Sequence, residues 1–183
     1  MLSLLITKPN NKQTINEIID FVGNSPGLFA KLMEYFVNGS SRVSQTTSWA
    51  LGHIGELQTE LIAPYHKILL LQLQDKTNKG AVRRNIVRIY QTCPIPEEIE
   101  GEIYELAMHF MLDYNEAIAI RAFSMRICDH ISRKYPELIS ELLDAIRSIL
   151  PGASSGLKNR GQNTIRDLTK KMPRLVRHFF QFF

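Results

Sequence analysis

The chain has 183 residues, a length that suits one domain and allows a sizeable hydrophobic core. Hydrophobic residues make up 44% and charged residues 22% of it, the ordinary balance of a soluble globular protein, and the formal net charge is +4. No apolar run approaches the length that spans a bilayer, and the apolar start MLSLLI is too short for the core of a signal peptide. We therefore expect no membrane partner.

Apolar residues recur at helical spacing along most of the chain, whereas β-branched runs with strict alternation are scarce. This pattern predicts an all-α protein. The first strong helical signal is TINEIIDFV, in which Thr14 and Glu17 have the spacing of a capping box ahead of an apolar stripe. It predicts a helix within residues 13–25, which we interpret as an N-terminal cap.

Four further apolar helical segments each follow a proline. Proline is tolerated in the first turn of a helix, because the N–H that it lacks would have no intrahelical partner there. The interval from Pro96 to Ile120 is longer than that from Pro64 to Val82, so the helix that follows Pro96 should be the longer one. The prolines are Pro26, Pro64, Pro96 and Pro136, within SPGLF, APYHK, IPEEI and YPELI.

Each of these segments is followed by a short turn and a second helical segment, and the second segments align with one another. In one of them Val82, Ile86 and Ile89 stand at i, i+4 and i+7, which predicts a buried helical stripe. The first aliphatic residues of the four segments are separated by 39, 38 and 37 residues. They are Val43, Val82, Ile120 and Leu157, which open VSQTTSWAL, VRRNIVRIY, IRAFSMRIC and LKNRGQNTI.

Paired helices that repeat at this length resemble HEAT-type or armadillo-like repeats. The resemblance covers residues 26–172 as about four degenerate copies. It implies an all-α fold, a right-handed α-α superhelix of about four helix pairs with capping terminal helices. We therefore expect a single helical-repeat domain over residues 1–183, with the N-terminal cap at 13–25 and a C-terminal cap or tail at 173–183.

HEAT families often carry an aspartate in the turn and a basic residue early in the second helix, and these form a ladder between neighbouring repeats. Asp75 precedes Arg83 by eight residues, and Asp113 precedes Arg121 by eight. The resemblance therefore implies structural roles for Arg83, Arg121 and the equivalent Lys158. The first and fourth copies lack the acid, which leaves the ladder incomplete.

The chain ends in MPRLVRHFFQFF, which contains four phenylalanines. One interpretation is that these side chains fold back and cover the last repeat, since a solenoid must cover its terminal units. The alternative is an apolar tail that binds a partner or a second copy of the chain. Self-association through this tail is therefore one possible partner interaction.

Basic residues are concentrated in three of the second helical segments, 80–92, 117–134 and 157–172. These contain twelve lysines and arginines but only two acids, Asp129 and Asp167, so they carry +10 against +4 for the whole chain. Second helices of such solenoids usually line the concave surface, which favours an anionic partner on that side. The alternative is that the basic side chains only solvate the helices and pair with acids nearby.

Helical geometry predicts which of these side chains face the partner. Residues six places after each first aliphatic residue should align along an open ridge, well away from the buried stripe. A tryptophan beside arginines would suit phosphates and stacked bases, although a lone tryptophan is more often part of a core. The residues at this position are Trp49, Arg88, Arg126 and Asn163, and the predicted partner-binding set adds Arg84, Arg133 and Arg166.

Catalytic and metal-binding motifs are missing from the sequence: the five histidines are scattered, and no HExxH, GxSxG, Walker loop or GxGxxG occurs. Cys93 and Cys128 fit small buried thiols in a reducing cytoplasm. The prediction is a cytoplasmic, non-enzymatic scaffold that needs no cofactor or metal and binds a protein or acidic peptide. The alternative is a nucleic-acid-binding protein similar to HEAT-like DNA alkylation-repair glycosylases, with Trp49 and Asp129 as its groove aromatic and acid.

Overall fold

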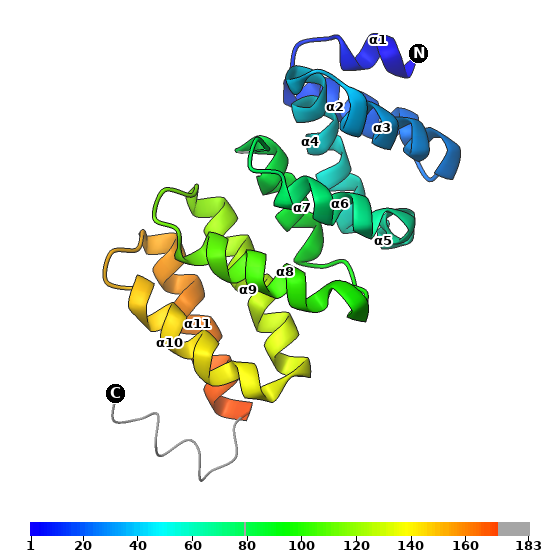
Figure 1. Cartoon of the computed structure of the whole chain (residues 1–183). Coiled ribbons are helices and arrows are strands. Elements are labelled where there is room, and N and C mark those ends of the chain that lie inside the picture. The colour runs from blue at the N-terminus through cyan, green and yellow to red at the C-terminus, as the bar shows by residue number, and fades with distance from the viewer. Residues whose placement is uncertain (79, 172–183) are drawn as a thin grey trace. The chain divides into compact units, whose positions relative to one another are not determined.

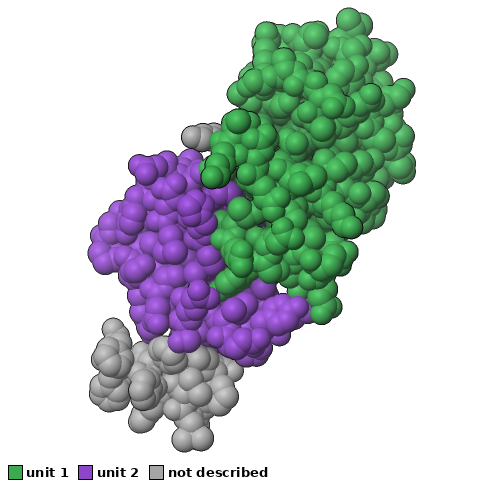
Figure 2. All heavy atoms as spheres, in the orientation of Figure 1, with its two compact units in different colours: residues 1–106 green, residues 107–183 purple. Residues whose placement is uncertain are grey.

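The computed structural model describes residues 1–78 and 80–171, and within these ranges the chain forms helices and no strands (Figure 1). Two compact units are present, Met1–Leu106 and Ala107–Phe183 (Figure 2). The boundary between them falls within α8. The α-helices are α1 Leu2–Ile6, α2 Lys12–Val22, α3 Pro26–Asn38, α4 Ser41–Leu57, α5 Thr59–Ile62, α6 His66–Gln74, α7 Ala81–Tyr90, α8 Glu97–Leu112, α9 Ile118–Lys134, α10 Ile139–Ile149 and α11 Ser155–Lys171. Two short 3-10 helices, Ala63–Tyr65 and Pro136–Leu138, precede α6 and α10.

The four prolines mark the first helix of each predicted pair. Pro26 is the first residue of α3, and the Ser25 hydroxyl caps that helix by accepting from the backbone N–H of Leu28. Pro64 and Pro136 lie in the two 3-10 turns, and Pro96 directly precedes α8. With 16 residues, α8 is longer than α3, α6 and α10, as the sequence predicts.

The second helices of the pairs are α4, α7, α9 and α11, and each begins within two residues of its predicted first aliphatic residue. The predicted stripe on α7 is confirmed, since Val82, Ile86 and Ile89 are all buried. Ile120 of α9 and Leu157 of α11 are fully buried as well. An apolar side chain every three to four residues is therefore what orients these helices toward the core.

The N-terminal helix begins differently from the prediction. Its cap is Asn11, whose side chain accepts from the backbone N–H of Thr14, so α2 starts at Lys12. Thr14 is buried inside the helix, and Glu17 instead accepts a hydrogen bond from Lys8 at 2.6 Å. The predicted capping box is therefore wrong, because the asparagine two residues before the predicted segment already satisfies the free N–H. A short helix that the sequence analysis did not predict, α1, precedes it.

In the first unit α4 packs closely against α7 because its contact face consists of small residues. A Cβ added at Gly52 would lie 3.2 Å from the Cβ of Asn85, and one added at Gly55 would lie 2.9 Å from Cγ1 of Ile89. The buried Asn85 side chain donates to the Ser48 hydroxyl at 3.2 Å, so the close approach also satisfies a buried polar group. The small residues Ser48, Gly52 and Gly55 of α4 thus determine how closely α4 and α7 approach each other.

The turn aspartates have a local role and do not form the implied ladder. Asp75 accepts from the backbone and hydroxyl of Thr77, and Asp113 accepts from the backbone of Asn115. Arg121 is nonetheless structural: it is 5% exposed, and its Nε donates to the carbonyl of Met111 at 3.0 Å. Its guanidinium also lies 4.8 Å from the centre of the Tyr114 ring. The ladder implied for Asp113 is therefore wrong, because a carbonyl and a ring anchor this arginine.

The second unit is built from α9, α10 and α11 together with the end of α8. Gly161 is at the close approach of α11 to α10, where an added Cβ would lie 2.8 Å from Leu150 and 3.0 Å from Ile146. Glycine therefore allows this packing despite its low helix propensity. The predicted cap or tail at 173–183 lies outside the described residues. None of the helices within the described ranges combines the length and the apolarity of a membrane span.

Candidate functional site

Trp49, His53 and Glu56 lie one helical turn apart on α4 and meet Arg88 of α7. The indole N–H of Trp49 donates to Nε2 of His53 at 3.1 Å. Nη1 of Arg88 lies 3.3 Å from the same histidine nitrogen, and Nη2 of Arg88 donates to Glu56 at 2.6 Å. These three side chains of α4 and Arg88 form what we name the Trp49 cluster, which the small contact face of α4 brings within reach of α7.

The hydrogen bonds of this cluster require a neutral His53. The indole N–H of Trp49 can only donate, so Nε2 of His53 accepts and carries no proton. Burial lowers the pKa of His53, and the positive charge of Arg88 lowers it further, whereas Glu56 acts in the opposite direction. The imidazole is therefore an uncharged connection between Trp49 and Arg88.

Two of the predicted ridge residues thus lie together, but their environment differs from the expectation. Trp49 is half-buried and hydrogen-bonded through its indole N–H. The Arg88 side chain is 26% exposed and neutralised by Glu56, a residue 32 positions earlier. Arg84, one turn before Arg88, is half-buried and forms no side-chain hydrogen bond or ion pair within the part of the chain that the structure describes. Arg84 is therefore a cation of α7 with no compensating acid among the described residues.

In the second unit a buried carboxylate organises two predicted arginines. Asp129 of α9 is 1% exposed, and each of its oxygens is bound by a different arginine. Nη1 of Arg126 donates to Oδ2 at 2.8 Å, and Nε of Arg133 donates to Oδ1 at 2.8 Å. Asp129 thus holds both guanidiniums in place, and the two arginines and one carboxylate together carry a net positive charge.

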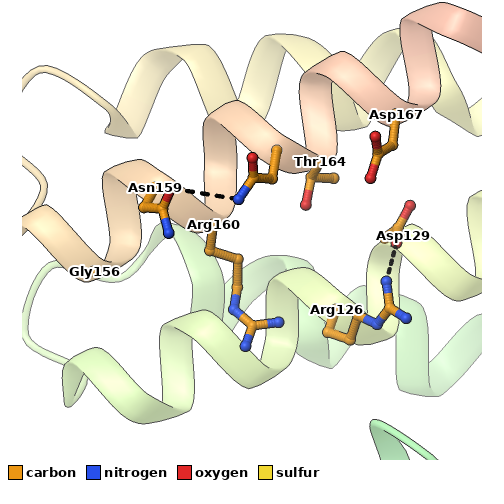
Figure 3. Close-up of a pocket in the computed structure, with 8 residues that line it drawn as sticks. Arg126, Asp129, Gly156, Asn159, Arg160, Thr164 and Asp167 are labelled. Carbon is orange, nitrogen blue, oxygen red and sulfur yellow. Dashed lines mark hydrogen bonds and ion pairs between the residues drawn. The ribbon is translucent and has the colours of Figure 1, made fainter.

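A recess of about 260 Å³ lies between α9 and α11 (Figure 3). We name it the α9–α11 recess. From α9 it is lined by Arg126 and Asp129. From α11 it is lined by Gly156, Asn159, Arg160, Asn163, Thr164 and Asp167. Their positions repeat once per helical turn, so these residues share one polar face of α11. Leu157, Gly161 and Leu168 lie on another face and are buried.

The remaining predicted residues of this unit belong to the recess or adjoin it. Asn163 lines it, and Arg166, whose side chain is 61% exposed, donates to the Asn163 oxygen at 2.7 Å. Asn159, Arg160 and Thr164 were absent from the predicted set. Their spacing along the polar face of α11 could have identified them, but the sequence does not show that this face lies opposite Arg126.

The side chains at the candidate site are mainly hydrogen-bond donors. No group of three histidines, cysteines or carboxylates suited to a metal ion occurs among residues 1–78 and 80–171. Both cysteines are free and buried, as predicted, and burial raises the pKa of Cys93 to about 11, which keeps its thiol protonated. The α9–α11 recess instead offers guanidinium, amide and hydroxyl groups, which suit the binding of an anion.

Comparison with known proteins agrees with the helical pairs seen in both units. Neither the curated proteins nor the solved structures contain a match. A family model described as a HEAT repeat domain matches residues 4–168. The match includes residues of all four predicted pairs and ends within α11, and the fold is an all-α solenoid. The chain therefore belongs to the HEAT repeat domain family.

Proposed function

We propose that this protein is a non-enzymatic scaffold that binds an acidic segment of a partner protein on its basic second helices. HEAT repeats generally mediate protein interactions, which supports a scaffold as the coarse function. The finer proposal concerns the charge of the docked segment and the helices that receive it. It also includes a cytoplasmic location, which two free and buried cysteines support.

The observation that carries the proposal is that arginines outnumber acids within α7, α9 and α11. Helix α7 contains no acid, and the one acid of α9, Asp129, is buried and already bound by arginines. The Arg126 side chain is still 45% exposed. On α11 the Arg166 side chain is 61% exposed and lies 3.8 Å from Asp167, the one acid of that helix. Helix surfaces with such an excess of positive charge attract negatively charged segments, in each unit by itself.

Nucleic acid is a second candidate, because a half-buried tryptophan beside an arginine could stack a base and bind a phosphate. The Trp49 cluster argues for the protein segment over this candidate. The indole N–H of Trp49 is used by His53, and Arg88 is neutralised by Glu56 at 2.6 Å. The cation beside the tryptophan is therefore already occupied.

The test compares a fluorescein-labelled acidic peptide with labelled single- and double-stranded oligonucleotides, by anisotropy at two salt concentrations. Replacing Arg84, Arg126 and Arg166 by glutamine should weaken peptide binding about tenfold or more, since charge-assisted hydrogen bonds are lost. Replacing Lys31, Lys67 and Lys76 by glutamine removes the same charge from exposed positions outside the second helices. This control should change the affinity less than about threefold.

Each outcome decides between the candidates. No peptide binding by the wild type at low salt would reject the acidic-segment proposal. An equal loss in both triple variants would show that general charge, and not the second helices, attracts the peptide. Preferential binding of an oligonucleotide, with an affinity that falls steeply with salt, would establish the nucleic-acid alternative.

A further inference from the structure

We propose that the α9–α11 recess binds the phosphate group of a phosphorylated serine or threonine in the docked protein segment; this inference rests on the proposed function. The recess lies on two second helices and has four donor side chains along its wall, Arg126, Asn159, Arg160 and Thr164. Ligand pockets for drug-sized molecules are about 300–1,000 Å³. A recess of about 260 Å³ is suited to one modified side chain.

Two hydrogen bonds in series determine the orientation of the Asn159 amide and leave its NH₂ group available as a donor. The guanidinium of Arg166 can only donate, so the atom of Asn163 that it meets at 2.7 Å must be the amide oxygen. The Asn163 nitrogen consequently donates to the Asn159 oxygen, at 3.4 Å. The NH₂ of Asn159 forms no hydrogen bond with any residue that the structure describes, and it lies on the side of Arg160 (Figure 3).

Two guanidiniums supply the positive charge. Arg160 extends from α11 toward α9 (Figure 3), and its side chain forms no hydrogen bond or ion pair with any residue in the described ranges. Arg126 uses Nη1 for Asp129, and its other N–H groups donate to no residue within 1–78 and 80–171. Gly156 places the first turn of α11 at the same recess, and the partial positive charge of a helix N-terminus adds to that of the arginines.

The two carboxylates of the recess do not exclude an anion. Both oxygens of Asp129 are occupied by arginines, and Asp167 is half exposed to water and near Arg166. Arg126, Arg133, Arg160 and Arg166 thus face two carboxylates, which leaves a positive excess. A phosphate monoester has a charge near −2 and three terminal oxygens, so it can use donors from four side chains, whereas a carboxylate has two oxygens.

The experiment uses the full chain and three labelled peptides that are identical except for a central serine, glutamate or phosphoserine. We expect the phosphoserine peptide to bind at least about tenfold more tightly than the glutamate peptide. Arg160→Gln should weaken the phosphoserine peptide about tenfold, and Asn159→Asp should do the same by replacing the free NH₂ with a negative oxygen. Lys67→Gln, which removes an exposed cation from α6, outside the second helices, should change it less than about threefold.

Competition with inorganic phosphate and circular dichroism of every variant complete the test. Equal affinities for the glutamate and phosphoserine peptides would overturn the phosphate assignment while leaving the acidic-segment scaffold intact. An equal loss in Lys67→Gln would also overturn it, because the recess would then have no special role. If the peptides and the acidic peptide of the previous assay all fail to bind, the proposed function fails as well.

Discussion

Replacing Gly55 by alanine should destabilise the first unit by about 1–2 kcal/mol. The added Cβ would lie 2.9 Å from Cγ1 of Ile89 and 3.0 Å from Cδ1 of Ile62, and both isoleucines are fully buried. Carbon atoms in contact prefer separations of about 3.5–4.0 Å, so α4 or its neighbours must shift. Overpacking of this kind costs about 1–3 kcal/mol, whereas the better helix propensity of alanine offsets at most about 1 kcal/mol.

Gly101→Ala is the matched control, because it makes the same substitution within a helix of the same unit. Gly101 lies in α8, is exposed, and would have no atom within 4 Å of an added Cβ. It should stabilise the unit by about 0.5–1 kcal/mol through helix propensity alone. Urea unfolding followed by the fluorescence of Trp49, the one tryptophan, reports on this unit. The midpoints of the two variants should differ by about 1 M.

The sign of the Gly55→Ala effect tests the packing argument. If both alanine variants stabilise the unit to the same extent, helix propensity alone governs both positions. The contact of α4 with Ile62 and Ile89 would then be looser than the structure shows, and small residues would not set the spacing of α4 and α7. A decrease in the dependence of the unfolding free energy on urea would indicate a loss of two-state unfolding instead.

Asp129→Asn should cost the second unit about 1–3 kcal/mol in a thermal melt, because the buried carboxylate accepts from two arginines. The control is Asp144→Asn, which removes an exposed carboxylate from an i,i+3 ion pair with Arg147. It should cost less than about 0.5 kcal/mol. Acidification should destabilise the first unit, because burial and then Arg88 lower the pKa of His53. As the pH falls, His53 is protonated in the unfolded chain before it is protonated in the folded one. The free energy of unfolding should therefore decrease as the pH drops below 6.5, the ordinary pKa of histidine. Trp49 fluorescence follows this loss, which His53→Gln should reduce. Removing residues 179–183 should lower the melting temperature if the phenylalanines form a cap, or abolish self-association in analytical ultracentrifugation if they form an interface.

The helices could be predicted because their signals are local. The buried stripe of Val82, Ile86 and Ile89 follows from spacing alone, since side chains three and four residues apart share one face of a helix. Prolines ahead of the first helices and the near-constant spacing of the second ones were sufficient to predict the pairs. The start of α2 was misplaced because Asn11 and Thr14 are both good capping residues, and only the backbone geometry shows which of them caps.

The charged side chains of the candidate site required the tertiary structure. Arg84 and Arg88 are both arginines one turn apart on α7, yet among the described residues only Arg88 meets an acid. That acid is Glu56 of α4, 32 residues earlier in the chain. The sequence does not distinguish Arg160 from the other basic residues of the second helices. The packing of α11 against α9 places it at the recess. The periodicity of a helix determines which of its own faces is buried. Which charges remain without a partner depends on side chains that distant parts of the chain bring within hydrogen-bonding distance.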